Sequence, residues 1–345
     1  MVQNPVFEID MRHAFRKTLI SAALRQAASM AVAQEHAYGS QLQGFEYPHE
    51  VKRFVFTSQA QPLSMAYLDV APEKPNGRSV VLLHGKNFCA ANWESAITAL
   101  TDAGFRVVAP DQVGFCKSSK PQAYQFSLGQ LAYNTRALLE ELGIENAIIV
   151  GHSMGGMLGV RYALQYPQAT TQLVLVNPIG LEDWKAEGVP WRSVDAWHAR
   201  ELKTDFASIK KYQQDVYYHG QWKPAYDRWV GMLAGMYAGP GKQAVAWNQA
   251  LTSDMVFNQP VVYEFPKLKM PTTLFIGQRD RTAIGKDLAP PQLARRLGDY
   301  PALGRRAAAA IPSATLVEFV ELGHSPQIED PSRFNRELLK ALAPR

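Results

Sequence analysis

Short apolar runs rich in β-branched residues recur from residue 54 to the end of the chain and alternate with stretches of helical spacing. This alternation is typical of a mostly parallel sheet with helices on both faces. Only a short Gln/Pro turn separates the first two runs, so we expect them to pair antiparallel at one edge. The eight predicted strands are Phe54–Ser58, Met65–Val70, Ser79–Leu83, Phe105–Ala109, Ala147–Val150, Gln172–Val176, Thr272–Ile276 and Thr315–Val320.

Two helices have clear boundaries in the sequence. Ser127 followed by Gln130 predicts a capping box, and Gly143 ends that helix. Asp330 caps the other, with Pro331 at its first position. Both are predicted to pack on the sheet through apolar side chains, which are Leu131, Leu138, Leu139 and Leu142 in the first helix and Phe334, Leu338, Leu339 and Leu342 in the second.

The regular alternation stops between residues 181 and 266, where six of the seven tryptophans lie. This stretch predicts a helical, aromatic-rich lid inserted into a core of residues 51–180 and 267–345, with 1–50 as an N-terminal segment. Ligand sites are largely apolar and often lie between domains. We therefore expect Trp184, Trp191 and Trp197 to line a substrate pocket, and the alternative is that such rings fill a small core of the lid.

The strand Ala147–Val150 leads directly into Gly151-His152-Ser153-Met154-Gly155-Gly156, and a helical pattern follows. A serine between glycines in a strand–turn–helix context is the arrangement of an exposed nucleophile on a tight turn. A serine hydroxyl needs a base to take its proton. His324 follows the last strand and Asp280 follows Thr272–Ile276, so both are expected on the same rim as Ser153; Asp287 is the weaker carboxylate candidate.

An oxyanion of acyl transfer needs two N–H donors. The backbone N–H of Met154 follows the serine, and Lys86 in the loop after Ser79–Leu83 is the expected second donor, with Asn87 as the alternative. Its neighbours Asn87 and Phe88 are expected in the substrate pocket.

These motifs resemble the α/β-hydrolase fold superfamily, in its lid-bearing branch of serine esterases, haloperoxidase-like enzymes and C–C bond hydrolases. The resembling stretches are His84-Gly85, Asp111 to Pro121, Gly151 to Gly156, Gly277 to Asp280 and Gly323 to Pro326. Cys116 stands where members often have glycine. The resemblance implies a hydrolase of carboxylic esters or lactones that works through an acyl-enzyme on Ser153, without metal or organic cofactor. The alternatives are a C–C bond hydrolase of ring-cleavage products and a ligand-binding homologue without turnover.

Composition and charge restrict the partners. The net charge of +5 comes from 36 basic and 31 acidic residues without a concentrated basic face, which argues against nucleic acid. No apolar stretch is long enough for a transmembrane helix. We therefore expect a small-molecule, apolar ester as substrate, and the oligomeric state stays open. Cys89 and Cys116 lie in loops near the expected site; two buried free thiols are favoured over a disulfide, and no cluster has metal-ligand spacing.

The N-terminus carries a pattern of its own. The basic run Arg12 to Lys17, the apolar Thr18–Leu24 and an Ala-Val-Ala ending at Ala33 resemble a secretory signal interrupted by Arg25. Periplasmic or secreted location is the first expectation, and a cytoplasmic protein with an amphipathic N-terminal helix is the alternative. The first 33 residues are predicted to be dispensable for catalysis.

Overall fold

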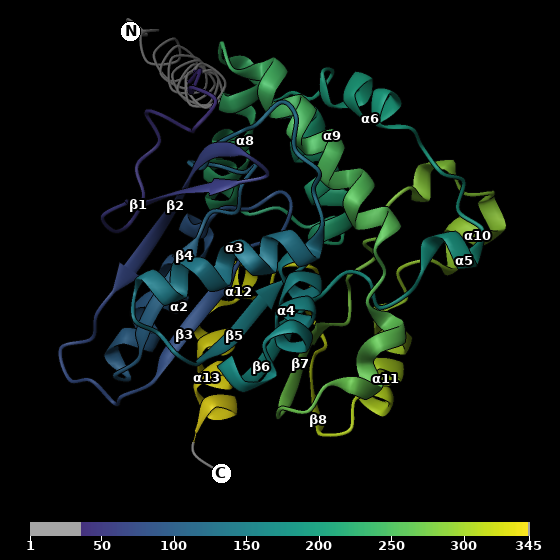
Figure 1. Ribbon diagram of the computed structural model, residues 1–345. Coiled ribbons are helices and arrows are strands. Elements are labelled where there is room, and N and C mark those ends of the chain that lie inside the picture. Colours follow the sequence, from purple (N-terminus) through teal and green to yellow (C-terminus); the bar gives the residue numbers. More distant parts are fainter. Residues whose placement is uncertain (1–35, 344–345) are drawn as a thin grey trace, which may run out of the picture.

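The computed structural model describes residues 36–343 and is built around an eight-stranded sheet (Figure 1). The strand order is β1-β2-β4-β3-β5-β6-β7-β8; β1–β2 and β2–β4 pair antiparallel and the other pairs are parallel. The predicted fold class and the antiparallel edge are therefore confirmed. The strands are β1 Lys52–Ser58, β2 Gln61–Val70, β3 Ser79–Leu83, β4 Arg106–Pro110, β5 Ala147–His152, β6 Thr170–Val176, β7 Thr272–Gly277 and β8 Ala314–Phe319.

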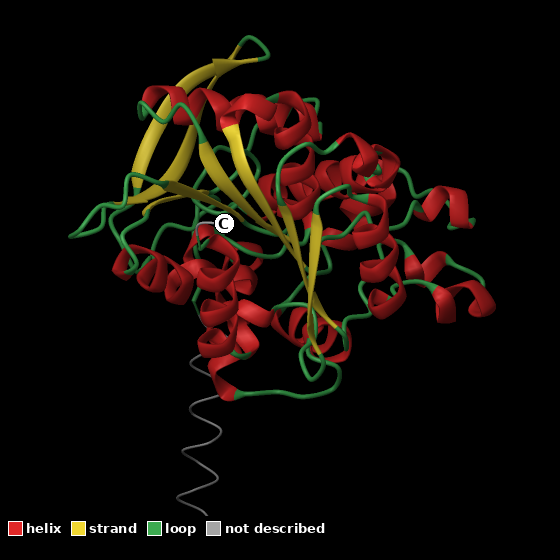
Figure 2. Ribbon diagram, turned by 90° about the horizontal axis from the view of Figure 1, so that it is seen from below, coloured by secondary structure: helices red, strands yellow, loops and turns green. Residues whose placement is uncertain are grey.

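Helices cover both faces of the sheet (Figure 2). The alternation of strand side chains divides the core accordingly: Val81 and Leu83 of β3 pack on one side, and Val80 and Leu82 on the other. One layer consists of α3 Leu128–Glu141, α4 Met154–Gln165 and α11 Tyr300–Ala310, and the other of α2 Glu94–Asp102 and α13 Pro331–Leu342. Two shorter helices, α10 Pro291–Arg296 and α12 Pro326–Glu329, lie in the loops after β7 and β8.

The predicted helix boundaries hold, with one difference in detail. The Ser127 hydroxyl accepts from the Gln130 N–H at 3.0 Å, but the Gln130 side chain donates to Asn134 instead of returning to Ser127. Only half of the predicted capping box therefore forms. The Asp330 carboxylate accepts from the Arg333 N–H at 3.0 Å and begins α13 as expected.

The chain between β6 and β7 is helical, and no strand occurs in its described residues. Its helices are α5 Trp184–Glu187, α6 Val194–Glu201, α7 Phe206–Tyr212, α8 Asp227–Ala238 and α9 Lys242–Asn258, and a π-helical turn, Gln213–Tyr217, follows α7. Helix α6 packs on α9, and α8 contacts both α7 and α9. The division of the chain into a core and a separate lid unit stays a prediction.

The two cysteines form a disulfide, so the expectation of free thiols is wrong. Their loops follow β3 and β4, which are neighbouring parallel strands, and this places the two Cα atoms 5.8 Å apart. Cys116 also has a φ of 44°, in the region that favours glycine. This backbone geometry agrees with the glycine often found at that position in the family it resembles.

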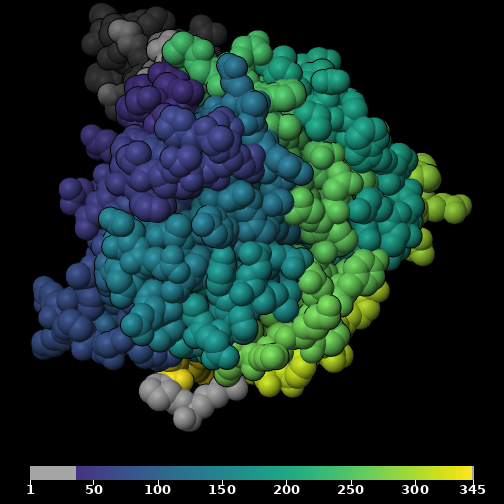
Figure 3. Space-filling model, viewed as in Figure 1, coloured from purple at the N-terminus to yellow at the C-terminus, as the bar shows by residue number. Residues whose placement is uncertain are grey.

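The N-terminal segment from residue 36 joins the insertion to the core. The Tyr38 N–H donates to the Gly235 carbonyl of α8 at 2.8 Å, Leu42 is fully buried, and the Tyr47 hydroxyl donates to Asp111 at 2.7 Å. The purple segment lies beside green atoms of the insertion (Figure 3). The predictions for the first 33 residues lie outside the described part of the chain. Within that part, no helix is long and apolar enough to cross a membrane.

Candidate active site

Ser153 lies on the tight turn between β5 and α4. Its φ of 56° and ψ of −121° are strained for a residue with a side chain, and only a structure that surrounds it tightly can hold them. A Cβ on Gly151 would collide with the Gly155 carbonyl, and a Cβ on Gly155 would collide with the Leu83 carbonyl. The two glycines are therefore required by the close approach of strand and helix, as the motif predicts.

The structure brings Ser153, His324 and Asp280 together in one hydrogen-bonded chain. The distance from His324 Nε2 to Ser153 Oγ is 2.9 Å, and from His324 Nδ1 to Asp280 Oδ2 it is 2.6 Å. His324 and Asp280 are fully buried and Ser153 is 4% exposed. The three residues that the sequence selected thus meet in the order that proton transfer from a serine to an imidazole requires.

Asp280 is held by more than the imidazole. Its Oδ2 also accepts from the Asn177 side-chain amide at 2.9 Å, and its Oδ1 accepts from the N–H and hydroxyl of Thr282 at 2.8 and 2.7 Å. These donors stabilise a buried carboxylate, which is costly without such partners. Asp287 lies elsewhere and pairs with Arg192 and Arg200.

Two other histidines are near the site but engaged in structural contacts. His84 Nε2 accepts from the Gln112 N–H at 3.0 Å, while its Nδ1 lies 2.7 Å from the Gly85 carbonyl. His152 Nε2 lies 2.8 Å from the His324 carbonyl oxygen. Burial lowers the pKa of both imidazoles, that of His152 strongly. Both rings therefore support the loops around Ser153 in neutral form.

The loop that carries His324 is fixed by Glu329. Both Glu329 oxygens lie 3.0 Å from the Gly323 N–H, and Oε1 also accepts from the Ser325 N–H at 3.1 Å. Burial raises the pKa of Glu329 to about 7. A single carboxylate thus binds the amides on both sides of His324.

Tyr217, from the π-helical turn of the insertion, covers His324. Its ring stacks on the imidazole with a centroid distance of 4.4 Å and an interplanar angle of 27°, and its carbonyl accepts from the His324 N–H at 2.8 Å. Its hydroxyl accepts from the Asn87 side-chain amide at 2.9 Å. The insertion therefore contacts the imidazole directly.

The expected oxyanion donors are arranged around Ser153. Met154 is the first residue of α4, and the loop with Lys86 packs so closely that a Cβ on Gly85 would lie 2.8 Å from Ser153 Cβ. Within residues 36–343, no acceptor is paired with the Met154 or Lys86 backbone N–H. Their role as oxyanion donors stays a prediction.

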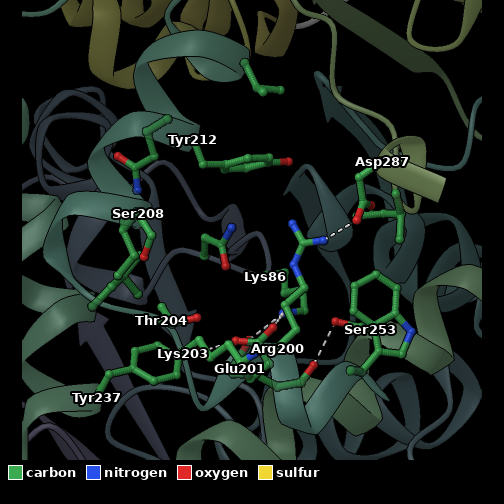
Figure 4. A pocket seen from close by; sticks show the side chains of 18 of the residues that line it. Lys86, Arg200, Glu201, Lys203, Thr204, Ser208, Tyr212, Tyr237, Ser253 and Asp287 are labelled. Carbon is green, nitrogen blue, oxygen red and sulfur yellow. Dashed lines mark hydrogen bonds and ion pairs between the residues drawn. The ribbon is translucent and has the colours of Figure 1, made fainter. Parts of the chain in front are cut away.

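A cavity of 710 Å³ lies between the insertion and the loops after β3 and β7. Lys86 and Asn87 line it from the β3 loop, and Arg281 and residues 283–287 line it from the β7 loop. Figure 4 shows Lys86, Arg200, Tyr212 and Tyr237 among its side chains. Ser153 and His324 do not line it. Asn87, which does, donates to the hydroxyl of Tyr217, and the Tyr217 ring stacks on the imidazole.

The predicted pocket residues divide into two groups. Asn87 and Trp197 line the cavity, while Phe88, Trp184 and Trp191 do not. Phe88 packs against His152 and Tyr217, and Trp184 is buried with its indole N–H on Glu182. Trp191 is 60% exposed and donates to Asp254. Aromatic concentration locates the insertion but does not show which rings face its cavity.

Sequence reasoning missed four residues that contact the site: Asn177, Tyr217, Thr282 and Glu329. Two of them could have been predicted from their positions in the sequence. Asn177 is the first residue after β6, and Thr282 is the second residue after Asp280. Glu329 lies one helical turn beyond Ser325, so its contact with the Ser325 backbone could also have been predicted. Tyr217 lies in the insertion and has no such signal.

A family model described as the alpha/beta hydrolase fold matches residues 78–331, and the chain belongs to this family. A solved structure, a probable hydrolytic enzyme from Pseudomonas aeruginosa, is 62% identical, with a TM-score of 0.89, and the match covers 90% of this chain and 99% of that one. The fold and these relatives make the chain a hydrolase.

Two curated relatives give a wider comparison. A 2-hydroxymuconate semialdehyde hydrolase from Pseudomonas putida is 25% identical over 81% of this chain and 92% of that protein. An uncharacterized protein from Mycobacterium tuberculosis is 37% identical over 31% of this chain, a match that spans 30% of its length.

Proposed function

We propose that this chain is a serine hydrolase that cleaves carboxylic esters or lactones through an acyl-enzyme on Ser153. The supporting observation is the buried hydrogen-bonded chain from Ser153 through His324 to Asp280. In it His324 Nε2 takes the proton of the serine hydroxyl while Asp280 orients and stabilises the imidazolium. These three roles are assigned here as part of the proposal.

The remaining steps follow from the groups around Ser153. Its Oγ attacks the carbonyl carbon, and the oxyanion is bound by the backbone N–H groups of Met154 and Lys86. One such donor contributes about 3 kcal/mol to lowering the barrier in a serine protease. His324 then protonates the leaving alcohol, and a water activated by His324 releases the acid and restores the serine.

The test is covalent labelling with a fluorophosphonate combined with turnover of short 4-nitrophenyl esters. Ser153→Ala is expected to abolish both, because it removes the attacking oxygen, while the circular-dichroism spectrum stays unchanged. Ser332→Ala, an exposed serine in α13, is the matched control and is expected to behave as the unmodified protein. Full turnover in Ser153→Ala would contradict the proposal.

The second candidate is hydrolysis of a C–C bond in a vinylogous diketone. The observation that favours it is the similar Pseudomonas putida protein, whose name is 2-hydroxymuconate semialdehyde hydrolase. Both reactions use the same serine and base, so the triad does not separate them. Parallel assays with esters, lactones and a vinylogous diketone decide between them. Labelling without any turnover would favour a ligand-binding homologue.

We also infer that the protein works in an oxidising compartment, periplasmic or extracellular. The Cys89–Cys116 disulfide supports this location, because such bonds persist there and are rare in the reducing cytosol. Thiol alkylation of protein from its native host tests it. Two alkylated cysteines without prior reduction would contradict the inference.

A further inference from the structure

The cavity beside the site is strongly charged for an enzyme of apolar esters. Eight of its lining residues carry charge, five basic and three acidic: Lys86, Arg200, Lys203, Arg281 and Lys286 against Glu201, Asp215 and Asp287. Lys86, Glu201 and Lys286 are half-buried, where charge is costly unless it is paired, and the other five side chains are exposed. The question is therefore which of these charges already have partners within the protein.

All three acidic residues are paired. Glu201 binds Lys86 at 3.2 Å and also accepts from the Tyr237 hydroxyl, Asp287 binds both Arg192 and Arg200, and Asp215 binds Lys211 at 2.7 Å. The pair between Arg200 and Asp287 is drawn in Figure 4. No acidic side chain of the cavity is left to neutralise a further cation.

Arg281, Lys286 and Lys203, by contrast, have no carboxylate partner among the ion pairs of residues 36–343, and of these three only Arg281 and Lys286 lie together on one loop. Arg281 donates to the backbone carbonyls of Gln278 and Asp280, and Lys286 donates to those of Arg281 and Leu297, the last at 2.9 Å. Backbone carbonyls orient these cations but leave their net charge in place. Both residues lie on the loop that follows β7, on one wall of the cavity.

The carboxylates on this wall and beside it are already engaged, and Asp287 on the wall itself is bound by Arg192 and Arg200. Asp280 is bound to His324, Asn177 and Thr282, as described above. Glu182 accepts from the Trp184 indole N–H at 3.2 Å and from the Gly298 N–H at 2.9 Å. Arg281 and Lys286 therefore line the cavity without a carboxylate bound to either of them.

We propose that Arg281 and Lys286 bind an anionic group of the substrate, so that this hydrolase acts on esters or related carbonyl compounds that carry a carboxylate. This proposal rests on the proposed function, and it changes the expected substrate from an apolar ester to one that carries an anionic group. Arg281 directly follows the triad carboxylate, so the bound anion lies on the triad side of the cavity. A guanidinium binds a carboxylate through two parallel N–H donors, and an ammonium adds a point charge.

Matched ester pairs test the proposal. Mono-4-nitrophenyl succinate and 4-nitrophenyl butyrate share a leaving group and differ in a carboxylate for a methyl group on the acyl side. 4-Carboxyphenyl butyrate and 4-carbamoylphenyl butyrate compare a carboxylate with a neutral carboxamide on the alcohol side of the ester. In at least one pair the anionic ester is expected to have about tenfold higher kcat/KM through a lower KM, and the preference should decrease at high salt.

The variants Arg281→Gln and Lys286→Gln, alone and combined, test whether these two side chains bind the anionic group. They are expected to lower kcat/KM for the anionic ester about tenfold more than for its neutral partner, which removes the preference, because only the anionic ester makes a charge-assisted contact. Arg295→Gln and Lys340→Gln, exposed cations outside the cavity, are the matched controls and should keep the preference.

The outcomes separate the two proposals. Turnover of neutral esters with no preference for either anionic ester would overturn the anionic substrate, and so would a preference that survives in the double variant. No turnover of any ester together with no labelling of Ser153 would instead contradict the proposed function. Preference in the acyl pair or the alcohol pair supports the inference and states on which side of the scissile bond the anion lies.

Discussion

Four donors converge on the Asp280 carboxylate, and the imidazole is only one of them. Asn177 and Thr282 supply the others, so the side chain keeps its orientation even when the His324 proton moves. Asn177 has a φ of 38°, and its side-chain oxygen accepts from the Gly277 N–H at 2.8 Å, which ties the ends of β6 and β7 together. The arrangement of Ser153, His324 and Asp280 thus depends on two further residues, Asn177 and Thr282.

Asp280→Asn is expected to lower kcat strongly, by up to about 10⁴-fold as for the equivalent change in a serine protease. The reason is that an amide favours the wrong tautomer of His324. Steady-state turnover of a 4-nitrophenyl ester measures the effect. Asp102→Asn, an exposed carboxylate at the end of α2, is the control. A loss of less than threefold at position 280 would mean that another group orients the imidazole.

Glu329 gives a pH-dependent contribution to stability. Because its pKa rises from the ordinary value of 4.5 to about 7 in the folded protein, the folded state retains a proton that the unfolded state has lost between these pH values. This contribution is present below pH 4.5 and is lost as pH rises through 7, up to about 3 kcal/mol.

Glu329→Gln removes this titration, so urea unfolding of both proteins at pH 5 and pH 8 measures it. The free energy of unfolding of the unmodified protein, relative to that of Glu329→Gln, is expected to be higher at pH 5 than at pH 8. An equal difference at both pH values would show that Glu329 has an ordinary pKa.

The π-helical turn Gln213–Tyr217 is where the insertion meets the loop after β8. A π-helical turn in a helix is uncommon and occurs frequently at functional sites. Here it ends at Tyr217, whose ring and carbonyl both contact His324. The insertion consequently contacts the proposed base, His324, as well as lining the cavity.

Tyr217→Ala is expected to lower kcat by about two- to thirtyfold, because an aromatic face stabilises a nearby cation by about 0.5–2 kcal/mol and His324 becomes cationic in the reaction. Tyr217→Phe keeps the ring and should retain most of kcat, although it loses the hydrogen bond to Asn87. Tyr226→Ala removes a buried ring that stacks on Tyr218 instead. If that variant lost as much kcat as Tyr217→Ala, the effect would come from lid packing and not from contact with the imidazole.

The segment from residue 36 to β1 connects the insertion with the sheet. It contacts α8 through Tyr38, buries Leu42, and binds Asp111 through Tyr47. Asp111 also accepts from the Ala90 and Lys117 N–H groups at 2.8 and 3.0 Å, so the same carboxylate fixes the two loops that the disulfide joins. Removal of this segment would therefore loosen both sides of the cavity.

A shortened chain that begins at Val51 is expected to unfold at a lower temperature than one that begins at Gln34, since burial of a leucine alone contributes about 1.5–3 kcal/mol. Differential scanning calorimetry measures the difference. Gly235→Ala in the full chain should act in the same direction, because its Cβ would collide with the Tyr38 ring. Equal melting temperatures for the two shortened chains would show that the segment contributes no stability.

The strands, the fold class and the residues that meet at the triad could be predicted from local patterns. An apolar run followed by a glycine turn defines a strand end, and parallel strands bring their carboxyl ends to one edge. Ser153, Asp280 and His324 each follow such an end, so their convergence follows from topology alone.

Three features could be determined only from the tertiary structure, because they depend on contacts between segments distant in sequence: the burial of the insertion's tryptophans, the disulfide and the charge of the cavity. Trp184 begins α5 and is buried, whereas Trp191 lies between α5 and α6 and is exposed, a difference that the residue type does not show. The Cys89–Cys116 bond depends on the adjacency of β3 and β4. The unpaired charge of the cavity depends on which acidic side chains already form ion pairs with basic ones. Composition cannot show this, because an ion pair requires the two side chains to lie close together in the fold.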